Sequence, residues 1–168
     1  MNDDAKKTAL RMIPYGLYVM TAMSKDGTVI AASTVNWVTQ TAFAPPLLVV
    51  GVKKDSGAHS VAKDAGVFAL NILGKDQGNI AYAFFKATER AGDTVNGQPF
   101  RHGSTGAPLL EAVPAWVECR LVETVERGDH SVFIAEVIEA GLKQPIEGRP
   151  DDATLTLKDL GPKVFYGG

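Results

Sequence analysis

The chain has 168 residues, of which 45% are hydrophobic and 21% charged, as is ordinary for a globular protein with its own core. Its formal net charge of −2 argues against a nucleic-acid-binding protein, because that class carries a basic patch or stripe. The lone cysteine, Cys119, excludes an internal disulfide and a metal site built from a cysteine cluster.

The N-terminal stretch, residues 1–12, is acidic and then amphipathic, and it lacks the apolar core of a signal peptide. No stretch approaches the roughly 18 consecutive apolar residues that a membrane-spanning helix needs. We therefore expect a single domain over residues 1–168 that lies in the cytoplasm and has no membrane or nucleic-acid partner.

The first half of the chain is rich in strand signals. Residues 17–22 are β-branched and aromatic, the turn Lys25-Asp26-Gly27 follows, and residues 28–35 return, which predicts a hairpin. The continuous apolar run 47–52 predicts a strand buried on both faces, and residues 67–73 predict another strand.

Two helices are expected between these strands and the C-terminal half. Residues 57–65 form the first, with Ser56 as N-cap and Gly66 as its C-terminal stop. Residues 77–86 form the second, with Ile80, Ala81 and Phe84 on one apolar stripe.

The second half predicts a long loop and then a long hairpin. Residues 91–114 hold four glycines and three prolines and are expected to form an ordered loop. Residues 115–125 alternate in polarity, and after a Gly128-Asp129 turn residues 132–140 pair back, with Phe133, Ala135 and Val137 pointing inward. The pattern predicts a mainly β fold with a few short helices, arranged as a closed or nearly closed barrel.

Residues 31–46 are the strongest candidate for a binding site. Hydroxyl and amide side chains are dense here, just before a Pro-Pro pair and a very apolar strand; they are Ser33, Thr34, Asn36, Thr39, Gln40 and Thr41. This density indicates a rim that hydrogen-bonds a flat polar ligand. The alternative is an edge strand whose serines and threonines only face water.

Familiar catalytic motifs are absent from the sequence. It contains no glycine-rich dinucleotide or phosphate-loop motif, no H-E-x-x-H and no G-x-S-x-G. The three histidines, His59, His102 and His130, lack metal-ligand spacing, so we expect no metal site.

Five strings nonetheless follow one another in a suggestive order: IPYGLYVMTAMSKDG, AASTVNWVTQTAFAPPLLVVGVKKDS, GVFALNILGKDQGNIAYAFF, VECRLVETVERGDHSVFIAEVIEA and GPKVFYGG. Together they resemble the flavin reductase-like family of FMN-binding split barrels over residues 10–166. The sequence WVTQTAFAPP most resembles the flavin reductase modules of cyanobacterial flavodiiron proteins. The resemblance implies an FMN-binding split β-barrel.

The resemblance also implies where noncovalently bound FMN contacts the chain. The ring edge and ribityl chain would meet the polar strand and one later aromatic, namely Ser33, Thr34, Val35, Asn36, Trp37, Thr39 and Phe85. For Trp37 the alternative is a packed aromatic of the core or of a dimer contact. In place of the family's usual Ser and Asp before Pro-Pro this chain has Ala42 and Ala44, which leaves only backbone contacts there.

The phosphate is expected at the loop Lys53-Lys54-Asp55-Ser56, since the free amides of a helix N-terminus suit an anion. The alternative is that Ser56 only caps the helix and the lysines are solvated. Relatives often have Thr after the loop Ser, but this chain reads SGAH, so His59 either replaces that donor or faces solvent. Arg90 is expected to reach the phosphate or a partner subunit.

His130 is the candidate catalytic residue. In the family, the matching histidine lies near the flavin face, where it contacts nicotinamide or substrate; an imidazole there can hydrogen-bond a carboxamide or supply a proton. The alternative is an ordinary surface residue in a turn. The resemblance thus implies a homodimeric NAD(P)H-dependent flavin reductase that transfers hydride from nicotinamide to flavin. The reduced flavin would then pass electrons to free flavin, oxygen, ferric iron or an acceptor protein. Alternatives are an FMN-containing electron carrier and a flavin-binding module without turnover.

Overall fold

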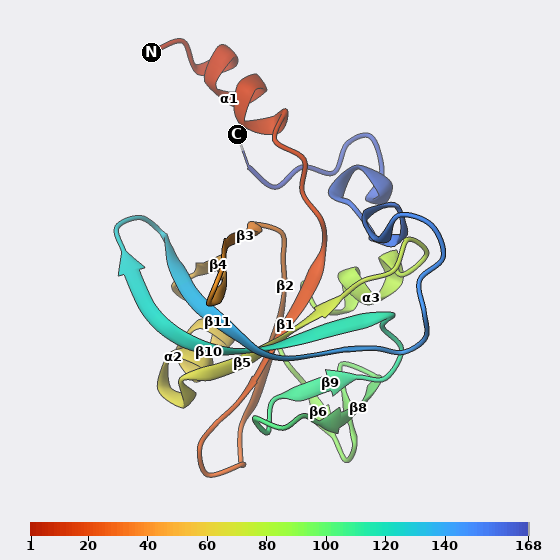
Figure 1. Ribbon diagram of the computed structural model, residues 1–168. Coiled ribbons are helices and arrows are strands. Elements are labelled where there is room, and N and C mark those ends of the chain that lie inside the picture. Colours follow the sequence, from red (N-terminus) through yellow and green to blue (C-terminus); the bar gives the residue numbers. More distant parts are fainter. Residues whose placement is uncertain (168) are drawn as a thin grey trace.

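The computed structural model describes residues 1–167, which form a long curved sheet, a small second sheet and several short helices (Figure 1). In chain order the elements are α1 (Asp3–Arg11), β1 (Tyr18–Met23), β2 (Ile30–Val35), β3 (Val38–Phe43), β4 (Pro46–Lys53), α2 (Gly57–Ala65), β5 (Val67–Ile72), α3 (Gly78–Ala83), β6 (Arg90–Ala91), β7 (Thr94–Val95), β8 (Gln98–His102), β9 (Pro108–Leu110), β10 (Ala115–Glu126), β11 (His130–Leu142) and the short 3₁₀ helices η1 (Pro150–Ala153) and η2 (Leu157–Leu160).

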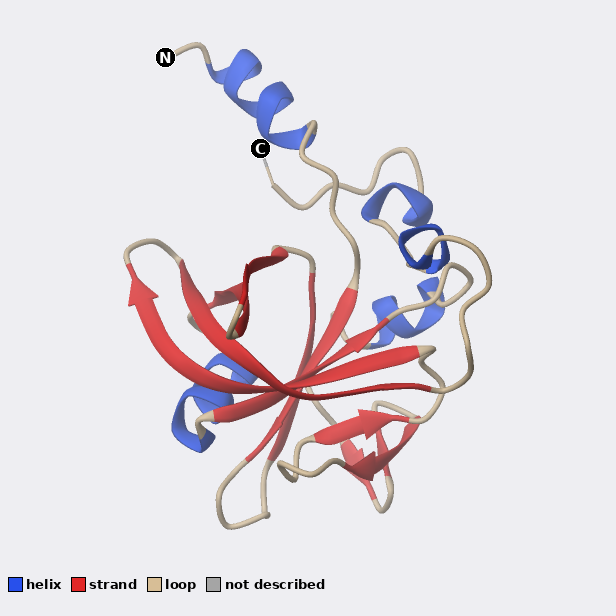
Figure 2. Cartoon of the chain, viewed as in Figure 1, coloured by secondary structure: helices blue, strands red, loops and turns tan. Residues whose placement is uncertain are grey.

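The large sheet is a split barrel, which confirms the predicted fold class. Its strand order is β2-β1-β5-β10-β11-β4-β3, with every neighbouring pair antiparallel. The two edge strands, β2 and β3, are separated in sequence only by Asn36 and Trp37. Two residues cannot cross a flat seven-stranded sheet, whose strands lie about 4.8 Å apart. The sheet therefore curls until its edges meet (Figure 2).

Both predicted hairpins are confirmed. In β1–β2, Tyr18 lies opposite Val35 and Met23 opposite Ile30. In β10–β11, Phe133 and Ala135 are fully buried in the barrel core, as the alternation predicted. Two register shifts interrupt this second hairpin, each of which adds bend and twist to a long strand pair.

Strand β4 corrects one expectation, because it is not buried on both faces. Leu48, Val50 and Val52 are buried, whereas Leu47, Val49 and Gly51 are only half-buried. The strand belongs to an antiparallel sheet, in which a single face needs to cover the core. The apolar run therefore indicated a strand correctly but overstated its burial.

The helices agree closely with their sequence signals. Helix α2 has the predicted bounds, with Ser56 as N-cap and Gly66 in the left-handed conformation at its end (φ 74°). Helix α3 is shorter than predicted, and its apolar stripe is buried. At the N-terminus α1 buries none of its residues and projects from the barrel beside the C-terminal segment (Figure 1).

The predicted loop 91–114 is wrong as a loop. It contributes β7, β8 and β9, which together with β6 form a four-stranded sheet below the barrel. Val95, Phe100, Leu109 and Leu110 carry its buried side. Strands of two to five residues are too short to show a clear alternation of polar and apolar side chains. The many glycines and prolines of this segment therefore indicated a loop.

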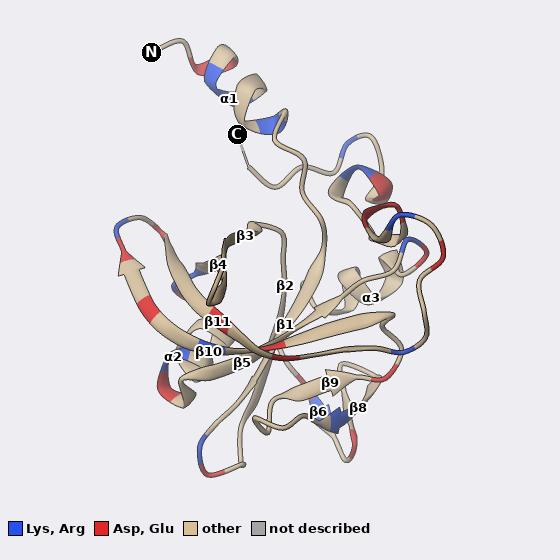
Figure 3. Ribbon diagram, viewed as in Figure 1, with Lys and Arg blue, Asp and Glu red and all other residues tan. Residues whose placement is uncertain are grey.

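Charged residues are scattered over the fold, with acidic and basic positions interspersed (Figure 3). None of the helices within residues 1–167 is long and apolar enough to span a membrane.

Candidate functional site

A cavity of about 910 Å³ lies beside the split of the barrel. That volume is at the upper end of the range for small-molecule sites. Seven separated parts of the chain line it: Leu17, residues 29–36 of the first hairpin, residues 51–53 and 55–57 with Ser60 and Val61 around the start of α2, segment 84–88, His130, Leu157, and residues 164–166 near the C-terminus. The cavity thus gathers the segments that the sequence singled out and adds the end of the chain.

The polar face of β2 forms one wall, with Ser33, Thr34, Val35 and Asn36 lining the cavity. The Thr34 hydroxyl donates to the Ala81 carbonyl at 2.8 Å, so it can meet a ligand only as an acceptor. The Asn36 amide nitrogen donates to the Tyr166 carbonyl at 3.3 Å, which ties this wall to the C-terminal segment.

Segment 84–88 covers the outer edge of β2. The Thr88 hydroxyl accepts from the Ala32 amide at 2.9 Å and donates to the Ala32 carbonyl at 3.1 Å. The Thr34 amide donates to the Phe84 carbonyl at 3.2 Å. These bonds hold Phe85 in the cavity wall, where its side chain is 54% exposed and offers an apolar surface for a flat ring.

The loop between β4 and α2 is the anion-attracting end of the cavity. The Ser56 hydroxyl accepts from the His59 amide at 3.1 Å and donates to the Lys53 carbonyl at 2.8 Å. The first amides of α2, at Gly57 and Ala58, are among those that a helix leaves without an intrahelical partner. Their N–H groups and the helix dipole favour a negatively charged group such as a phosphate.

The two lysines of this loop have different positions. Lys53 lines the cavity, and its ammonium lies 3.1 Å from the Asp55 carboxylate, which partly neutralises it. Lys54 is not among the lining residues. It lies in the turn after β4, where its amide donates to the Asp129 carbonyl at 3.0 Å.

His59 lies behind the loop, where it is buried outside the cavity lining. Its Nε2 is 2.8 Å from the Ser131 hydroxyl and 3.9 Å from Glu126, which also pairs with Lys63 at 2.9 Å. Burial and the nearby Lys63 lower the pKa of His59, although Glu126 opposes the shift, so the ring is neutral at pH 7. His59 therefore braces the start of α2 against β11.

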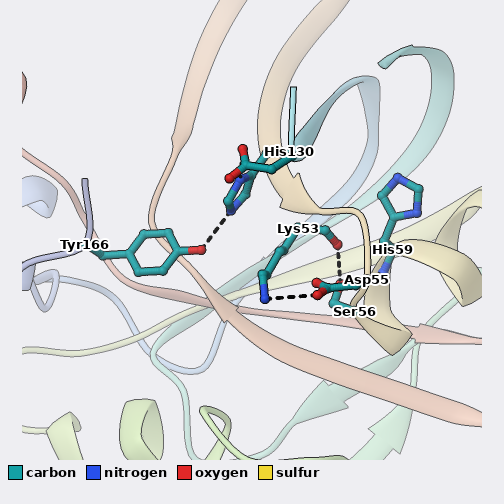
Figure 4. A network of polar contacts seen from close by, with 7 residues as sticks. Lys53, Asp55, Ser56, His59, His130 and Tyr166 are labelled. Carbon is teal, nitrogen blue, oxygen red and sulfur yellow. Dashed lines mark hydrogen bonds and ion pairs between the residues drawn. The ribbon is translucent and has the colours of Figure 1, made fainter. Parts of the chain in front are cut away.

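His130 lines the cavity from the first residue of β11, at the tip of the last hairpin (Figure 4). Its Nδ1 is 2.9 Å from the Asp129 carboxylate, and its Nε2 is 2.7 Å from the Tyr166 hydroxyl. The hydrogen bond with His130 lowers the pKa of Asp129, and burial raises the pKa of Tyr166. Asp129 is therefore ionised and Tyr166 protonated at neutral pH.

Trp37 supports this group from outside the cavity lining. Its ring centroid lies 4.6 Å from that of His130 and 5.3 Å from that of Tyr166. Its indole nitrogen is the one buried side-chain nitrogen or oxygen within residues 1–167 that has no hydrogen-bond partner. Trp37 thus acts through packing, and its N–H is not presented to the cavity.

The predicted site residues divide into two groups. Those that line the cavity are Ser33, Thr34, Val35, Asn36, Lys53, Ser56, Phe85 and His130, and those that do not are Trp37, Thr39, Lys54, His59 and Arg90. Thr39 is exposed on β3, and the Arg90 guanidinium lies over Phe100 at 5.8 Å. Sequence reasoning missed Tyr166, for which the aromatic pair in GPKVFYGG was the available signal.

The donor set fits a flavin nucleotide. A lysine and the start of a helix lie at one end for a phosphate, and the strand backbone and Phe85 lie along the walls for a planar ring. Within residues 1–167 no group of three or more His, Cys, Asp or Glu residues is placed to hold a metal ion.

Residues 10–159 match the family model described as "Flavin reductase like domain". The reductase component of 4-nitrophenol 4-monooxygenase/4-nitrocatechol 2-monooxygenase from Rhodococcus opacus is 37% identical over 125 residues, which cover 74% of this chain and 64% of that protein. Diflavin flavoprotein A 1 of Synechocystis is 32% identical over 140 residues, which cover 82% of this chain and 24% of that protein. This chain thus spans less than two thirds of the length of either relative.

Solved structures give the same picture. BorF, the flavin reductase component of a bacterial two-component tryptophan halogenase, superposes with a TM-score of 0.75 at 25% identity, over 99% of this chain and 98% of that one. The NADH:FAD oxidoreductase of Streptomyces globisporus, solved with NAD and FAD fragments, gives a TM-score of 0.67 at 27% identity, over 83% of this chain and 88% of that one. The sequence resemblance to this family is thereby confirmed.

Proposed function

Since this chain belongs to the flavin reductase-like domain family, we propose that it is an NAD(P)H-dependent flavin reductase that holds FMN noncovalently within one domain of residues 1–168. The observation that carries the proposal is the cavity at the barrel split, which joins an anion-attracting helix start to a wall of hydroxyl and backbone groups. His130 also lines the cavity, where its ring nitrogens are held by Asp129 and Tyr166.

A bound flavin would supply the redox chemistry, which is the acceptance of a hydride from the reduced nicotinamide. The chain's own residues would bind the flavin and orient it toward the nicotinamide. Lys53 and the first amides of α2 would hold the phosphate, with Ser56 capping the helix because its hydroxyl already donates to the Lys53 carbonyl, while Ser33, Thr34 and Asn36 would meet the polar edge of the ring system. Phe85 would shield an apolar surface from water, and the His130 side would face the nicotinamide.

FMN is proposed in preference to FAD because the cavity has a single anion-attracting end. The relative from Streptomyces is named for FAD, so FAD is the alternative cofactor that the experiment must test beside FMN. Flavin-free protein titrated with FMN, FAD and riboflavin should bind FMN at micromolar concentration or better. Tighter binding of FAD than of FMN would overturn this part of the proposal.

Two partners complete the proposal. The first is a second copy of the chain, supported by apolar side chains left exposed near the cavity and on β3, such as Phe85 and Phe43 at 54% and 91% exposure. The second is an oxygenase that receives the reduced flavin, supported by the reductase components among the relatives.

The decisive experiment is anaerobic stopped-flow mixing of the flavin-loaded protein with NADH and with NADPH. Bleaching of the flavin absorbance within seconds is the expected result. A flavin that stays oxidised with both nucleotides but is reduced by a separate electron-donor protein would make the chain an electron carrier instead.

A further inference from the structure

Both ring nitrogens of His130 already have partners inside the chain. Nδ1 is 2.9 Å from the Asp129 carboxylate, and Nε2 is 2.7 Å from the Tyr166 hydroxyl. His130 therefore has no nitrogen left for a ligand unless one of these bonds breaks. The His130 imidazole, which the family resemblance placed against nicotinamide, is thus held by Asp129 and Tyr166. A ligand on this side of the cavity would meet one of these two neighbours instead of a free imidazole nitrogen.

The positions of the protons follow from the chemistry of Asp129. An ionised carboxylate only accepts, so the His130 Nδ1 must carry the proton between them. In the neutral imidazole the Nε2 is then an acceptor, and the Tyr166 hydroxyl donates to it. The phenol oxygen keeps its acceptor capacity. Tyr166 thus presents an acceptor where His130 presents none.

Tyr166 is fixed in place by contacts on several sides. Its carbonyl accepts from the Asn36 amide at 3.3 Å, and its ring packs against Trp37. Arg11 holds the residues on either side, because its guanidinium lies 4.3 Å from the Phe165 ring centroid and its Nε donates to the Gly167 carbonyl at 3.3 Å. The phenol and His130 both line the cavity, and Figure 4 shows the hydroxyl directed at the imidazole.

We propose that Tyr166 is the residue that hydrogen-bonds the nicotinamide, with its phenol oxygen accepting an N–H of the carboxamide, and that His130 is the positioning residue that holds this phenol. The proposal rests on the function proposed above. The carboxamide is the one hydrogen-bond-donating group on the nicotinamide ring, and an acceptor fixed in the cavity wall complements it. The C-terminal segment would thereby complete the site that β2 and α2 begin.

The test compares wild type, Tyr166→Phe and the control Tyr82→Phe, which removes an exposed phenol bonded to the Leu160 carbonyl at 3.3 Å. Calorimetry on flavin-loaded protein measures the affinity for NAD⁺ and for its acetylpyridine analogue, which lacks the carboxamide N–H. Stopped-flow kinetics gives KM and kcat for NADH. The ¹⁵N chemical shifts of the His130 ring report its tautomer without any nucleotide.

Wild type should prefer NAD⁺ to the analogue by roughly two- to tenfold, the range for one hydrogen bond, and Tyr166→Phe should lose that preference. Its KM for NADH should rise by a similar factor while kcat changes less than about twofold, and Tyr82→Phe should match wild type. His130→Ala should have the same effect as Tyr166→Phe, and the double variant should be no worse than either.

Three results would overturn the proposal: an undiminished preference for NAD⁺ in Tyr166→Phe, protonation of His130 on Nε2 in wild type, or no binding of either nucleotide by wild type. These are separable from failure of the proposed function. A protein that binds NAD⁺ with the expected preference but does not reduce its flavin would leave the Tyr166 contact standing and remove the reductase activity.

Discussion

Replacement of Lys53 by alanine gives the sharpest test of the phosphate end of the cavity. The Lys53 side chain is 55% exposed and pairs with Asp55 at 3.1 Å, so a phosphate at the start of α2 would share an ammonium that is already partly neutralised. A hydrogen bond to a charged group contributes about 1.5–3 kcal/mol, and this exposure places Lys53 at the low end. About 1.5 kcal/mol corresponds to a roughly tenfold weaker Kd for FMN. Fluorescence titration of the flavin-free protein measures it.

The neighbouring Lys54 provides a matched control. Lys54→Ala removes the same charge within one residue, but its side chain lies outside the cavity lining. Long-range electrostatics should therefore change equally in both variants, and only Lys53→Ala should lose the local contact. Riboflavin, which lacks the phosphate, should bind both variants within about twofold of wild type. Equal weakening of FMN by the two variants, or parallel loss of FMN and riboflavin, would refute the placement of the phosphate.

Glu118→Gln should lower the free energy of unfolding by about 1–3 kcal/mol at neutral pH, because the buried carboxylate accepts from the amides and hydroxyls of Ser104 and Thr105. Burial raises the pKa of Glu118, but these hydrogen bonds outweigh burial and lower the pKa overall. The stabilisation of the folded protein by the ionised carboxylate is therefore complete above about pH 4.3, the ordinary glutamate value, and it is lost as the pH falls through the lowered pKa. Urea titrations should thus show the two proteins converging in acid, and a constant gap would contradict this account. Burial raises the pKa of Cys119 to about 12, so a thiol reagent at neutral pH should label it only when the protein unfolds, and rapid labelling of folded protein would be inconsistent with the structure. Light scattering of the FMN-loaded protein at micromolar concentration should report twice 17.9 kDa, and a mass of 17.9 kDa would disprove the proposed homodimer.

The elements that sequence predicted well are those with local causes. Helix α2 begins at a serine that caps it and ends at a glycine with positive φ, and both signals lie within the helix's own residues. The β1–β2 hairpin likewise depends on a turn at Gly27 and on alternation that each strand carries by itself. The core positions Phe133 and Ala135 followed from the same alternation.

The parts that sequence missed depend on contacts between distant residues. Tyr166 is 36 positions from His130, and nothing in the sequence GPKVFYGG indicates that the C-terminal segment packs beside the last hairpin. His59 was expected to donate to a phosphate or face solvent, but the rotation of α2 turns it toward Ser131. Lys53 and Lys54 were likewise not distinguished, because β4 ends at Lys53 and Lys54 lies in the following turn, where strand alternation no longer applies.

The split in the barrel explains why the site forms where it does. A sheet closed by hydrogen bonds would leave no edge, but here β2 and β3 are joined only by Asn36 and Trp37. The edge of β2 is satisfied by segment 84–88 instead of a strand, and the space beyond it is bounded by the start of α2 and the C-terminal residues. Because these bounding segments contribute little to the pairing of the seven strands, substitutions such as Tyr166→Phe should change ligand binding while leaving the free energy of unfolding close to that of wild type.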